Sequence, residues 1–429
     1  MKSIGKEIYE LIKELFPINR SLSGEGVRET LRILKRENSE LNIHSIKSGT
    51  QVFDWIVPKE WNCKEAYIIT PDGRKICDYN DNNLHLVQYS VPFEGEVELD
   101  ELQKHLYSLP KLSNAIPYVT SYYKERWGFC ISENERKKLK PGKYKVVIKS
   151  ELKSGVLNYA DIIIPGKSDK EIMFSTYICH PSMANNELSG PTLATFLAKY
   201  VKSIDNYYTY RFIFAPETIG SLIYLSKYLN HLKEKVIAGF ILTCVGDDRA
   251  YSYMPSRYGD TLADKVALNI LEYSIKDYKK YSFLQRGSDE RQYCAPGVDL
   301  PVCSIMRSKY GEYPEYHTSL DNLELVTPKG LEGSFNVYKK IIDVLESNYF
   351  YYKITVLGEP QLGKRGLYPD ACTPDTDYNL AFLYRNFLAY ADGKNDLIDI
   401  ANIIGISADK LIDIAKLFEK HNLIKVCYN

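Results

Sequence analysis

Three short, almost wholly apolar segments constrain the fold of this chain more than any other feature. They read EIMFSTYIC at 171–179, YRFIFAP at 210–216 and VIAGFILTCVG at 236–246. Segments of this length without polar alternation are typical of strands that are buried on both faces of a sheet. Helical patterns separate them, which favours parallel strands covered by helices. We therefore predict an α/β domain built around a mixed, centrally parallel sheet.

The pattern of predicted helices and strands divides the rest of the chain into domains. Residues 1–49 and 141–349 are expected to form the α/β domain together. Residues 50–140 contain short β-like runs separated by turn signals, so we expect them to form an inserted, mostly β domain. Within the α/β domain, the segments 143–152 and 155–165 are predicted to be an antiparallel pair of strands joined by a short turn.

Three helical patterns and a terminal strand follow residue 350, and we predict a winged-helix domain over 350–429. Gly405 lies between the last two helices, where helix-turn-helix units place their turn. The exposed positions of the last helix mix acidic and basic side chains: Asp409, Lys410, Asp413, Lys416, Glu419 and Lys420. DNA-reading helices carry basic or amide side chains at such positions, so this face favours a protein contact or a rigid appendage over nucleic acid.

The charge balance narrows the class of partners. Lys plus Arg and Asp plus Glu both number 55. A neutral chain lacks the general attraction of a basic protein to polyphosphates or anionic membranes. No apolar run is long enough to cross a bilayer, and segment 1–16 lacks the apolar core of a signal peptide. The nine cysteines are scattered without a CxxC pair, which is typical of cytoplasmic proteins with unpaired thiols. These features leave the oligomeric state open.

Polar side chains follow the predicted strands at the points where they end. His180 and a loop containing Glu187 follow the first strand, Glu217 follows the second, and Asp247 follows the third. His317 stands later, in EYHTSLDN. The carboxyl ends of parallel strands meet at one edge of a sheet, where open α/β folds place their sites. Two imidazoles and several carboxylates form a ligand set that suits Zn²⁺. The structural alternative is that each His is hydrogen-bonded and that Asp247 caps a turn.

Four motifs carry a resemblance to a known family. They read CHPSMANNELSGP, APETIGS, RGSDERQY and EYHTSLDN. Over residues 143–345 the chain resembles the zinc aminopeptidase family that also includes glutaminyl cyclases. As a whole it is most similar to bacterial aminopeptidase-like proteins with an inserted β domain and a C-terminal winged helix, which are associated with surface-polysaccharide biosynthesis. The resemblance implies a zinc exopeptidase-like fold.

The chain departs from the pattern of that family at four positions, one of which is Ser182, where an Asp two residues after His180 is expected. Asn186 stands where the family has an Asp that bridges two metal ions, and Pro216 stands where it has the general-base Glu. Thr243 stands where an acidic ligand is expected. A neutral amide is a poor bridge between cations. The resemblance therefore implies one zinc ion rather than two.

The resemblance assigns the remaining site residues as follows. One zinc ion is held by His180 or Glu187 together with Glu217 and His317. The general base is Glu187, Asp247 or Glu290.

Gly287-Ser288-Asp289 resembles the Ser-Asp segment that the family has beside its pocket. Residues in and near this segment are expected to contact the substrate. Ser288 and Asp289 lie in it, and Asn186 is expected to join them. Arg286 and Arg291 flank the segment; they either bind a carboxylate or acidic sugar or form ordinary surface ion pairs.

Two function classes follow from these features. The first is a cytoplasmic, metal-dependent hydrolase that cleaves an amide in a small peptide or in an amide-bearing, sugar-linked substrate by means of metal-activated water. The second is a catalytically silent binding or regulatory module with a peptidase fold, in which the winged helix mediates contact with a protein or a nucleic acid. The departures at Asn186 and Pro216 motivate the second class.

Overall fold

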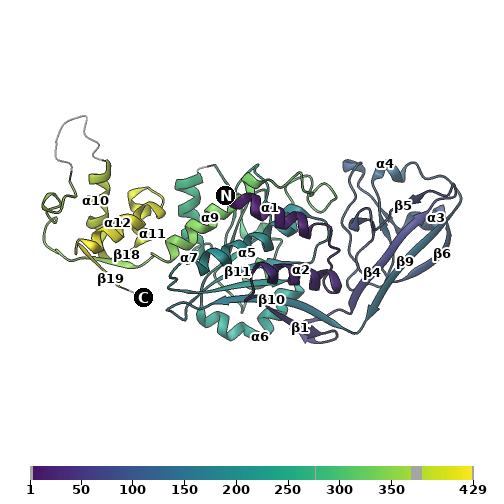
Figure 1. The fold of residues 1–429 in the computed structure, drawn as a ribbon, viewed down its shortest axis with the longest axis horizontal. Coiled ribbons are helices and arrows are strands. Elements are labelled where there is room, and N and C mark those ends of the chain that lie inside the picture. Colours follow the sequence, from purple (N-terminus) through teal and green to yellow (C-terminus); the bar gives the residue numbers. More distant parts are fainter. Residues whose placement is uncertain (1–2, 276, 369–378, 428–429) are drawn as a thin grey trace.

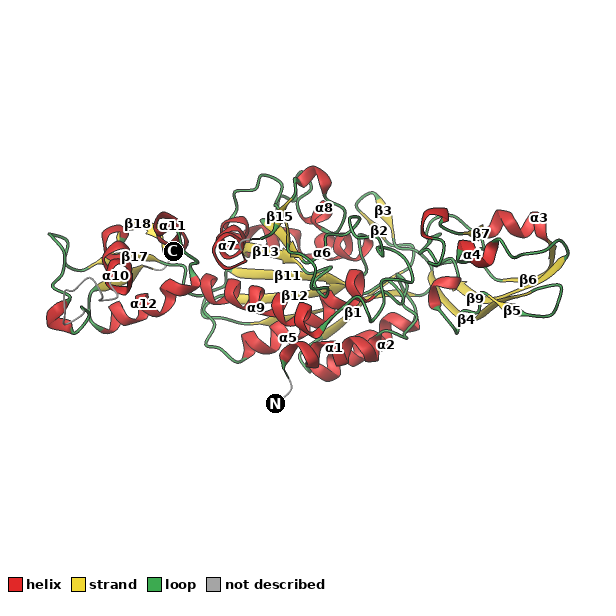
Figure 2. Ribbon diagram, turned by 90° about the horizontal axis from the view of Figure 1, so that it is seen from above, coloured by secondary structure: helices red, strands yellow, loops and turns green. Residues whose placement is uncertain are grey.

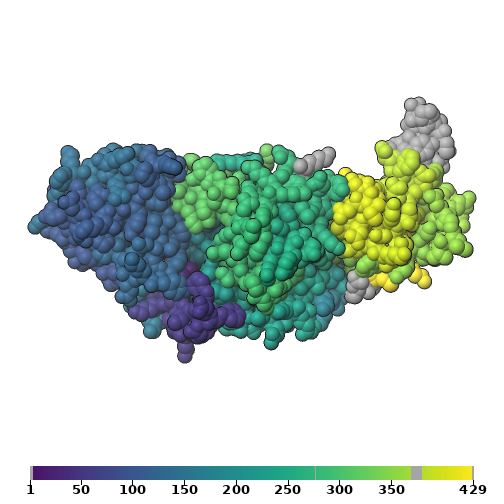
Figure 3. Space-filling model, turned by 180° about the vertical axis from the view of Figure 1, so that it is seen from behind, coloured from purple at the N-terminus to yellow at the C-terminus, as the bar shows by residue number. Residues whose placement is uncertain are grey.

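The protein has three parts arranged in a row (Figures 1 and 3). The computed structural model describes residues 3–275, 277–368 and 379–427. An α/β domain lies in the middle, a mostly β domain lies at one end, and a helical domain with a small sheet lies at the other. None of the helices within the described ranges is both long and apolar enough to span a bilayer.

The central sheet has eight strands in the order β1-β10-β12-β11-β13-β16-β14-β15. Their bounds, in that order, are Asn42–Lys47, Val156–Ile164, Thr209–Ala215, Glu171–Tyr177, Val236–Ile241, Val302–Met306, Ser252–Met254 and Lys279–Lys280. Strands β12, β11, β13 and β16 are mutually parallel, whereas β10 runs antiparallel to both of its neighbours and β14 runs antiparallel to β16. The predicted fold class, a mixed sheet with a parallel centre, is confirmed.

Helices cover both faces of this sheet (Figure 2). One face packs on α1 (Ile4–Leu15), α2 (Glu25–Glu37), α5 (Ser189–Lys202), α7 (Leu262–Ile270) and α9 (Pro328–Leu345). The other face packs on α6 (Ile219–Lys235) and α8 (Glu290–Tyr293). Successive side chains alternate between the two layers: Phe174 points into the first core and Met173 into the second, and both are fully buried. Burial on both faces explains why the strands lack polar alternation.

The inserted domain is organised by a four-stranded sheet in the order β5-β4-β9-β6. Its strands are β4 (Glu60–Ile69), β5 (Lys75–Ile76), β6 (Phe93–Glu98) and β9 (Lys143–Lys153). The smaller elements are β2 (Gln51–Val52), β3 (Trp55–Ile56), α3 (Leu99–Leu102), β7 (Leu106–Tyr107), β8 (Phe129–Cys130) and α4 (Glu133–Arg136).

The prediction that 143–152 pairs with 155–165 is wrong. Strand β9 pairs with β4 and β6, whereas β10 joins the central sheet. The physical reason lies in the side chains of β9, where lysines alternate with buried residues such as Tyr144 and Val146. That pattern suits a sheet with one solvated face, whereas β10 is almost wholly buried. A backbone hydrogen bond of 3.0 Å from the N–H of Ser48 to the carbonyl of Gly155 closes the base of the inserted segment.

The C-terminal domain is a winged helix. It contains α10 (Asn379–Tyr390), α11 (Leu397–Ile404) and α12 (Asp409–Lys420) beside the sheet β18-β17-β19, whose strands span Asp392–Asp396, Phe350–Lys353 and Ile424–Cys427. Gly405 ends α11 in the left-handed region at φ 81°, which a residue with a side chain adopts only with strain.

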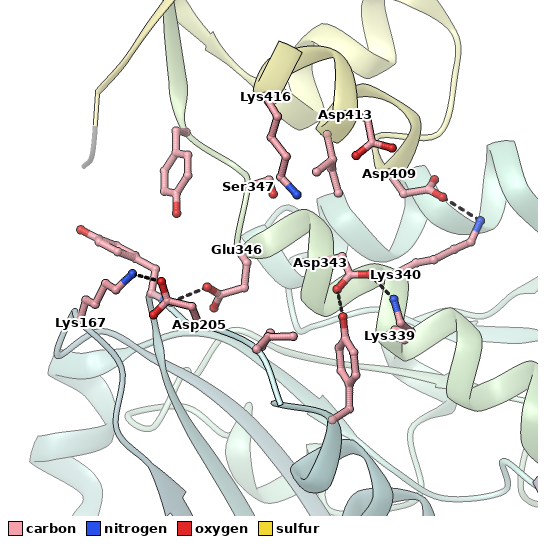
Figure 4. Close-up of a pocket in the computed structure, with 15 residues that line it drawn as sticks. Lys167, Asp205, Lys339, Lys340, Asp343, Glu346, Ser347, Asp409, Asp413 and Lys416 are labelled. Atoms are coloured by element: carbon pink, nitrogen blue, oxygen red, sulfur yellow. Dashed lines mark hydrogen bonds and ion pairs between the residues drawn. The ribbon is translucent and has the colours of Figure 1, made fainter. Parts of the chain in front are cut away.

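Helix α12 turns one face toward the α/β domain, across a cleft of about 800 Å³ (Figure 4). Asp409, Ile412, Asp413 and Lys416 line the cleft from this helix. Opposite charges are paired here: Nζ of Lys340 on α9 lies 2.9 Å from a carboxylate oxygen of Asp409. One face of α12 is therefore in contact with the α/β domain of the same chain.

Candidate functional site

The site begins where two neighbouring parallel strands end. Strand β11 ends at Tyr177 and β12 ends at Ala215, and these two residues are paired in register. His180 follows the first strand by three residues and Glu217 follows the second by two. This register brings Nε2 of His180 to 3.6 Å from Oε2 of Glu217. The side chains that follow these two strand ends therefore lie close together, as predicted.

His317 reaches the same place from a segment between β16 and α9. Its ring centroid lies 5.3 Å from that of His180, and its other face stacks on Tyr316 at 3.9 Å. Nε2 of His317 is buried and has no hydrogen-bond partner. A buried, unpartnered ring nitrogen is costly unless a ligand satisfies it, so this atom indicates a ligand position.

Glu187 lies on the opposite edge of the His180 ring. It belongs to a π-helical turn, Ala184–Leu188, and is completely buried. Its Oε2 lies 2.8 Å from Nδ1 of His180, whereas Glu217 faces Nε2. Metal-binding histidines are commonly oriented in this way by a carboxylate on the second ring nitrogen. The second carboxyl oxygen of Glu187 has no hydrogen-bond partner.

Arg20 stabilises the positions of His180 and Glu187. Its side chain is fully buried, and Nε donates to the carbonyl of His180 at 3.1 Å while Nη1 donates to the carbonyl of Leu15 at 2.7 Å. Burial lowers the pKa of Arg20 to about 10, and the proximity of Glu187 opposes that shift. The guanidinium is the cation that faces the buried Glu187.

The electrostatics of the cluster suit a metal ion. Burial lowers the pKa of His180 to about 3, with a further contribution from Arg20. Burial also lowers the pKa of His317 to about 3, with a further contribution from His180. Both imidazoles are therefore neutral at pH 7, which is the form that binds metals. Burial raises the pKa of Glu187 and Glu217 well above the usual range. A divalent cation reverses that shift by favouring the carboxylate form.

A second group of ligand-capable atoms shares His180. The candidate donor atoms of Cys179, His180 and Glu187 all lie within 4.8 Å of one another. This group is on the Nδ1 side of the imidazole, where Glu187 already forms a hydrogen bond. Sγ of Cys179 accepts a hydrogen bond of 3.3 Å from the N–H of Glu217, and burial raises the pKa of its thiol well above the usual range. The Nε2 side fits a metal better, because it faces Glu217 and the pocket.

Asn186 does not line the pocket that contains the two histidines. Its Oδ1 accepts a hydrogen bond of 3.2 Å from the hydroxyl of Tyr177, which also pairs with the hydroxyl of Thr243. The side chain is 1% exposed and lies outside the residues that line the pocket. The hydroxyl of Tyr177 thus links the side chains of Asn186 and Thr243, both of which are neutral.

Asp247 and Glu290, two of the three expected general bases, are held in hydrogen bonds elsewhere. Asp247 accepts from the side-chain amide of Asn185 at 3.0 Å and from the hydroxyl of Ser308 at 2.9 Å. Glu290 accepts from the N–H of Gly287 at 2.7 Å and from the hydroxyl of Tyr310 at 2.6 Å. Neither lines the pocket, and both are completely buried.

The Ser-Asp segment lies behind Glu217. Asp289 accepts from the N–H of Thr218 at 2.7 Å, and burial raises its pKa to about 7. Arg291 donates to the hydroxyl of Thr218 at 2.9 Å. Ser288 is buried and its hydroxyl has no partner, whereas Arg286 is exposed and donates to the carbonyl of Phe283. Asp289 and Arg291 thus position the residue next to Glu217, and Arg286 lies outside the pocket lining.

Asp321 supports the turn that carries Glu187, and the sequence patterns did not reveal this role. Its carboxylate accepts hydrogen bonds from the N–H groups of Ala184, Asn185 and Asn186, at 3.1, 2.6 and 2.9 Å. The hydroxyl of Tyr313 donates to it at 2.8 Å. These bonds hold the turn that carries Glu187. The only available signal was the acidic residue four positions after the expected ligand His317.

Part of the backbone strain in the described residues lies around the site. Ser182, Thr218, Cys244 and His317 adopt positive φ angles of 46°, 64°, 52° and 55° although none is glycine. Such conformations persist where the surrounding structure enforces them, and they cluster at functional sites. No pattern in the sequence signals them.

A pocket of about 400 Å³ opens above these residues. Cys179, His180, Glu217 and His317 form part of its lining. The opposite wall comes from the inserted domain and consists of Trp55, Tyr118, Thr120, Tyr122 and Tyr123. Sequence reasoning missed this wall, because it requires the inserted domain to be placed over the strand ends.

Comparison with known proteins agrees with this architecture. Residues 9–348 match the family described as a domain of unknown function, DUF4910, and residues 350–426 match a winged helix-turn-helix family. A Clostridium acetobutylicum protein, provisionally named as a polysaccharide biosynthesis protein with an aminopeptidase-like domain, is 44% identical over 423 residues. That match covers 98% of this chain and 96% of the relative.

Solved structures extend the comparison. A crystal structure from Clostridium acetobutylicum, provisionally described as a peptidase, has a TM-score of 0.92 at 43% identity and covers 99% of this chain and 96% of its own. A zinc aminopeptidase from Bacillus subtilis has a TM-score of 0.57 at 14% identity, covering 79% of this chain and 94% of its own. An M28 peptidase precursor from Shewanella amazonensis has a TM-score of 0.56 at 13% identity, covering 80% and 92%. These last two likenesses show a shared fold. The expected resemblance is confirmed: the chain has an aminopeptidase-like fold, belongs to the DUF4910 family and carries a C-terminal winged helix.

Proposed function

We propose that this protein is a metal-dependent hydrolase that cleaves an amide in a small peptide or in an amide-bearing sugar derivative. One zinc ion would be held by Nε2 of His180, the carboxylate of Glu217 and Nε2 of His317. The observation that carries the proposal is the 3.6 Å approach of His180 Nε2 to Glu217, beside the unpartnered Nε2 of His317. Two imidazoles and one carboxylate leave a position open for water or substrate, as catalytic zinc sites do.

The residues around the cluster have distinct roles in this proposal. When bound, the ion would activate a water molecule and polarise the substrate carbonyl. Glu187 orients His180 through Nδ1, so we assign it as a positioning residue rather than a ligand. Arg20 offsets the buried charge of Glu187. Tyr118 and Tyr122, whose hydroxyls are 2.6 Å apart, exclude water from the opposite side and offer a hydrogen-bond donor to the substrate.

Proton transfer is assigned to Glu217. Among the described residues that line the pocket, Glu217 is the only carboxylate. Asp289 lies behind it and contacts the backbone of Thr218 rather than the pocket. A ligand carboxylate has a second oxygen, and that oxygen is available to accept a proton from water.

A second candidate function is metal-dependent binding without turnover. Pro216 takes the family's general-base position, and Asp247 and Glu290 are held in hydrogen bonds away from the pocket. This arrangement favours a protein that retains the peptidase fold as a recognition module. The winged helix would then relay the bound state through its contact with α9.

Metal analysis and a substrate panel test the two candidates together. Purified full-length protein, reconstituted with zinc and dialysed, should retain about one equivalent by mass spectrometry. Aminoacyl anilides, dipeptides and N-acetylated amino sugars should then be tested for amide cleavage, with and without a chelator. Chelator-sensitive cleavage supports the hydrolase. Stoichiometric zinc without cleavage of any substrate favours the binding module, and protein that retains no metal contradicts both.

A further inference from the structure

The inserted domain places four aromatic side chains opposite the candidate metal ligands. Trp55, Tyr118, Tyr122 and Tyr123, hereafter the aromatic wall, all line the pocket that contains His180 and Glu217. Trp55 comes from the hairpin of β2 and β3, and the three tyrosines come from the loop before β8. The aromatic wall is therefore an addition of the inserted domain to a site whose other half belongs to the α/β domain.

The aromatic wall is graded from the floor of the pocket to its rim. At the floor, the ring of Tyr118 lies 5.1 Å from that of His180 and 5.2 Å from that of His317. At the rim, Trp55 is 38% exposed and Tyr123 is 58% exposed, with their centroids 5.8 Å apart at 68°. Large aromatic faces left exposed beside a site are surfaces for a ligand.

The position of Tyr118, at the floor of the aromatic wall, is set by the same segment that carries His317. The N–H of Tyr118 donates to the carbonyl of His317 at 2.9 Å, and the N–H of Ser319 donates to the carbonyl of Ile116 at 2.9 Å. Arg126 secures the following residues, donating to the carbonyl of Thr120 at 2.9 Å. The floor of the aromatic wall is thus held by bonds within the protein, which limits the entropy cost of binding there.

The binding surface continues beyond the rim into a second pocket of about 450 Å³. Tyr122 and Tyr123 line both pockets, so they form the ridge between them. The second pocket adds polar groups from Ser48, Lys59, Lys124 and Glu125, and Nζ of Lys59 lies 3.6 Å from a carboxylate oxygen of Glu125. A ligand that spans the ridge meets flat aromatic faces in the middle and hydrogen-bonding groups at its edge.

We propose that the aromatic wall is a binding subsite for a pyranose ring, stacked on Trp55 and Tyr123. A pyranose has a C–H face that packs on an aromatic ring and a rim of hydroxyls that bonds to the polar groups around it. An apolar peptide side chain would form no hydrogen bonds with those polar groups. That this sugar belongs to the hydrolysed substrate rests on the proposed function, whereas sugar binding by the aromatic wall does not.

Binding by the full-length protein tests the subsite directly. The probes are methyl N-acetylglucosaminide and N,N′-diacetylchitobiose, compared with leucinamide and phenylalaninamide. Titration is followed by tryptophan fluorescence and calorimetry. We expect saturable binding of the glycosides in or below the millimolar range, tighter for the disaccharide because it reaches the second pocket. The variants Trp55→Ala and Tyr123→Ala should each weaken it by about tenfold. Trp55→Phe should retain most of the affinity.

Trp127→Phe is the matched control, because Trp127 stacks on His105 and Phe93 in the inserted domain and lines neither pocket. Its glycoside affinity should equal that of the unmodified protein. Tighter binding of the amino-acid amides, absence of saturable glycoside binding, or equal glycoside affinity in Trp55→Ala would overturn the subsite. Zinc content is measured on every variant and should not change. A protein that binds glycosides through Trp55 but retains no zinc would refute the proposed function and leave the subsite standing.

Discussion

Oε2 of Glu187 lies 2.8 Å from Nδ1 of His180, on the edge of the ring that faces away from the pocket. The other edge of the ring faces Glu217. One imidazole is therefore oriented by a buried carboxylate and presents its second nitrogen to the candidate metal position. The two glutamates therefore have different proposed roles: Glu187 orients the imidazole, and Glu217 is a candidate metal ligand. Residue type alone does not distinguish these roles.

Replacing Glu187 should weaken metal binding without removing a ligand. We expect Glu187→Ala to raise the zinc dissociation constant by about 10- to 100-fold, the usual effect of losing a carboxylate that orients a ligating histidine. Glu187→Gln should have a smaller effect, because its amide oxygen can still accept from Nδ1. Competition with a chromogenic chelator measures both. If Glu187→Ala abolished binding as completely as loss of His180 does, Glu187 would be a ligand.

Replacing His317 should abolish tight zinc binding. Its unpartnered Nε2 is one of three proposed ligand atoms, so His317→Ala should retain far less than one equivalent after dialysis. Tyr316→Phe is the matched control, because it keeps the ring that stacks on His317 at 3.9 Å. Full zinc content in His317→Ala would remove this residue from the site.

Asp321 should make stability depend on pH between about 4 and 6. Burial raises its pKa from 3.8 to about 6, so the folded state binds the proton more tightly than the unfolded state does. The stabilising contribution of this group is fully present below pH 3.8 and is lost as pH rises through 6. The loss is on the order of 3 kcal/mol.

Denaturant unfolding of the unmodified protein and of Asp321→Asn at pH 4, 5, 6 and 7 checks this dependence. The difference between the two free energies of unfolding should change over that range. At pH 7 the variant should also be destabilised by about 1–3 kcal/mol, because an amide cannot accept all the hydrogen bonds that hold the turn of Glu187. A difference that is independent of pH would show that Asp321 does not titrate there.

Asn269 should control how firmly the winged helix is attached. Its Oδ1 accepts from the N–H of Ala408 at 2.7 Å, and its Nδ2 donates to Oδ1 of Asn402 at 2.7 Å. Asn269→Ala leaves the buried N–H of Ala408 without a partner and should weaken docking by about 1–3 kcal/mol. Hydrogen exchange in α12 should accelerate while exchange in β11 stays unchanged. Lys410→Ala, on the exposed side of α12, is the control and should behave like the unmodified protein.

Much of the fold could be predicted because local patterns carry it. The buried strands β11 and β12 are continuous apolar runs, and His180 and Glu217 follow them directly. Strand β9 was misplaced because nearness in the chain suggested β10 as its partner, although its alternating lysines indicated a half-solvated sheet. The alternation of lysines with buried residues can be read from the segment itself, whereas the pairing of β9 with β4 depends on residues far away in the chain.

The sequence by itself determined the layered α/β architecture, the winged helix and the convergence of His180 and Glu217 at two strand ends, because hydrophobic periodicity and strand-end position are properties of short segments. Only the tertiary structure decided which edge of His180 each glutamate occupies. It also placed Tyr118 against His317, 199 residues away in the chain, through a backbone hydrogen bond. Such contacts depend on how separate elements pack and on a strained turn at His317, and neither is encoded in a local pattern.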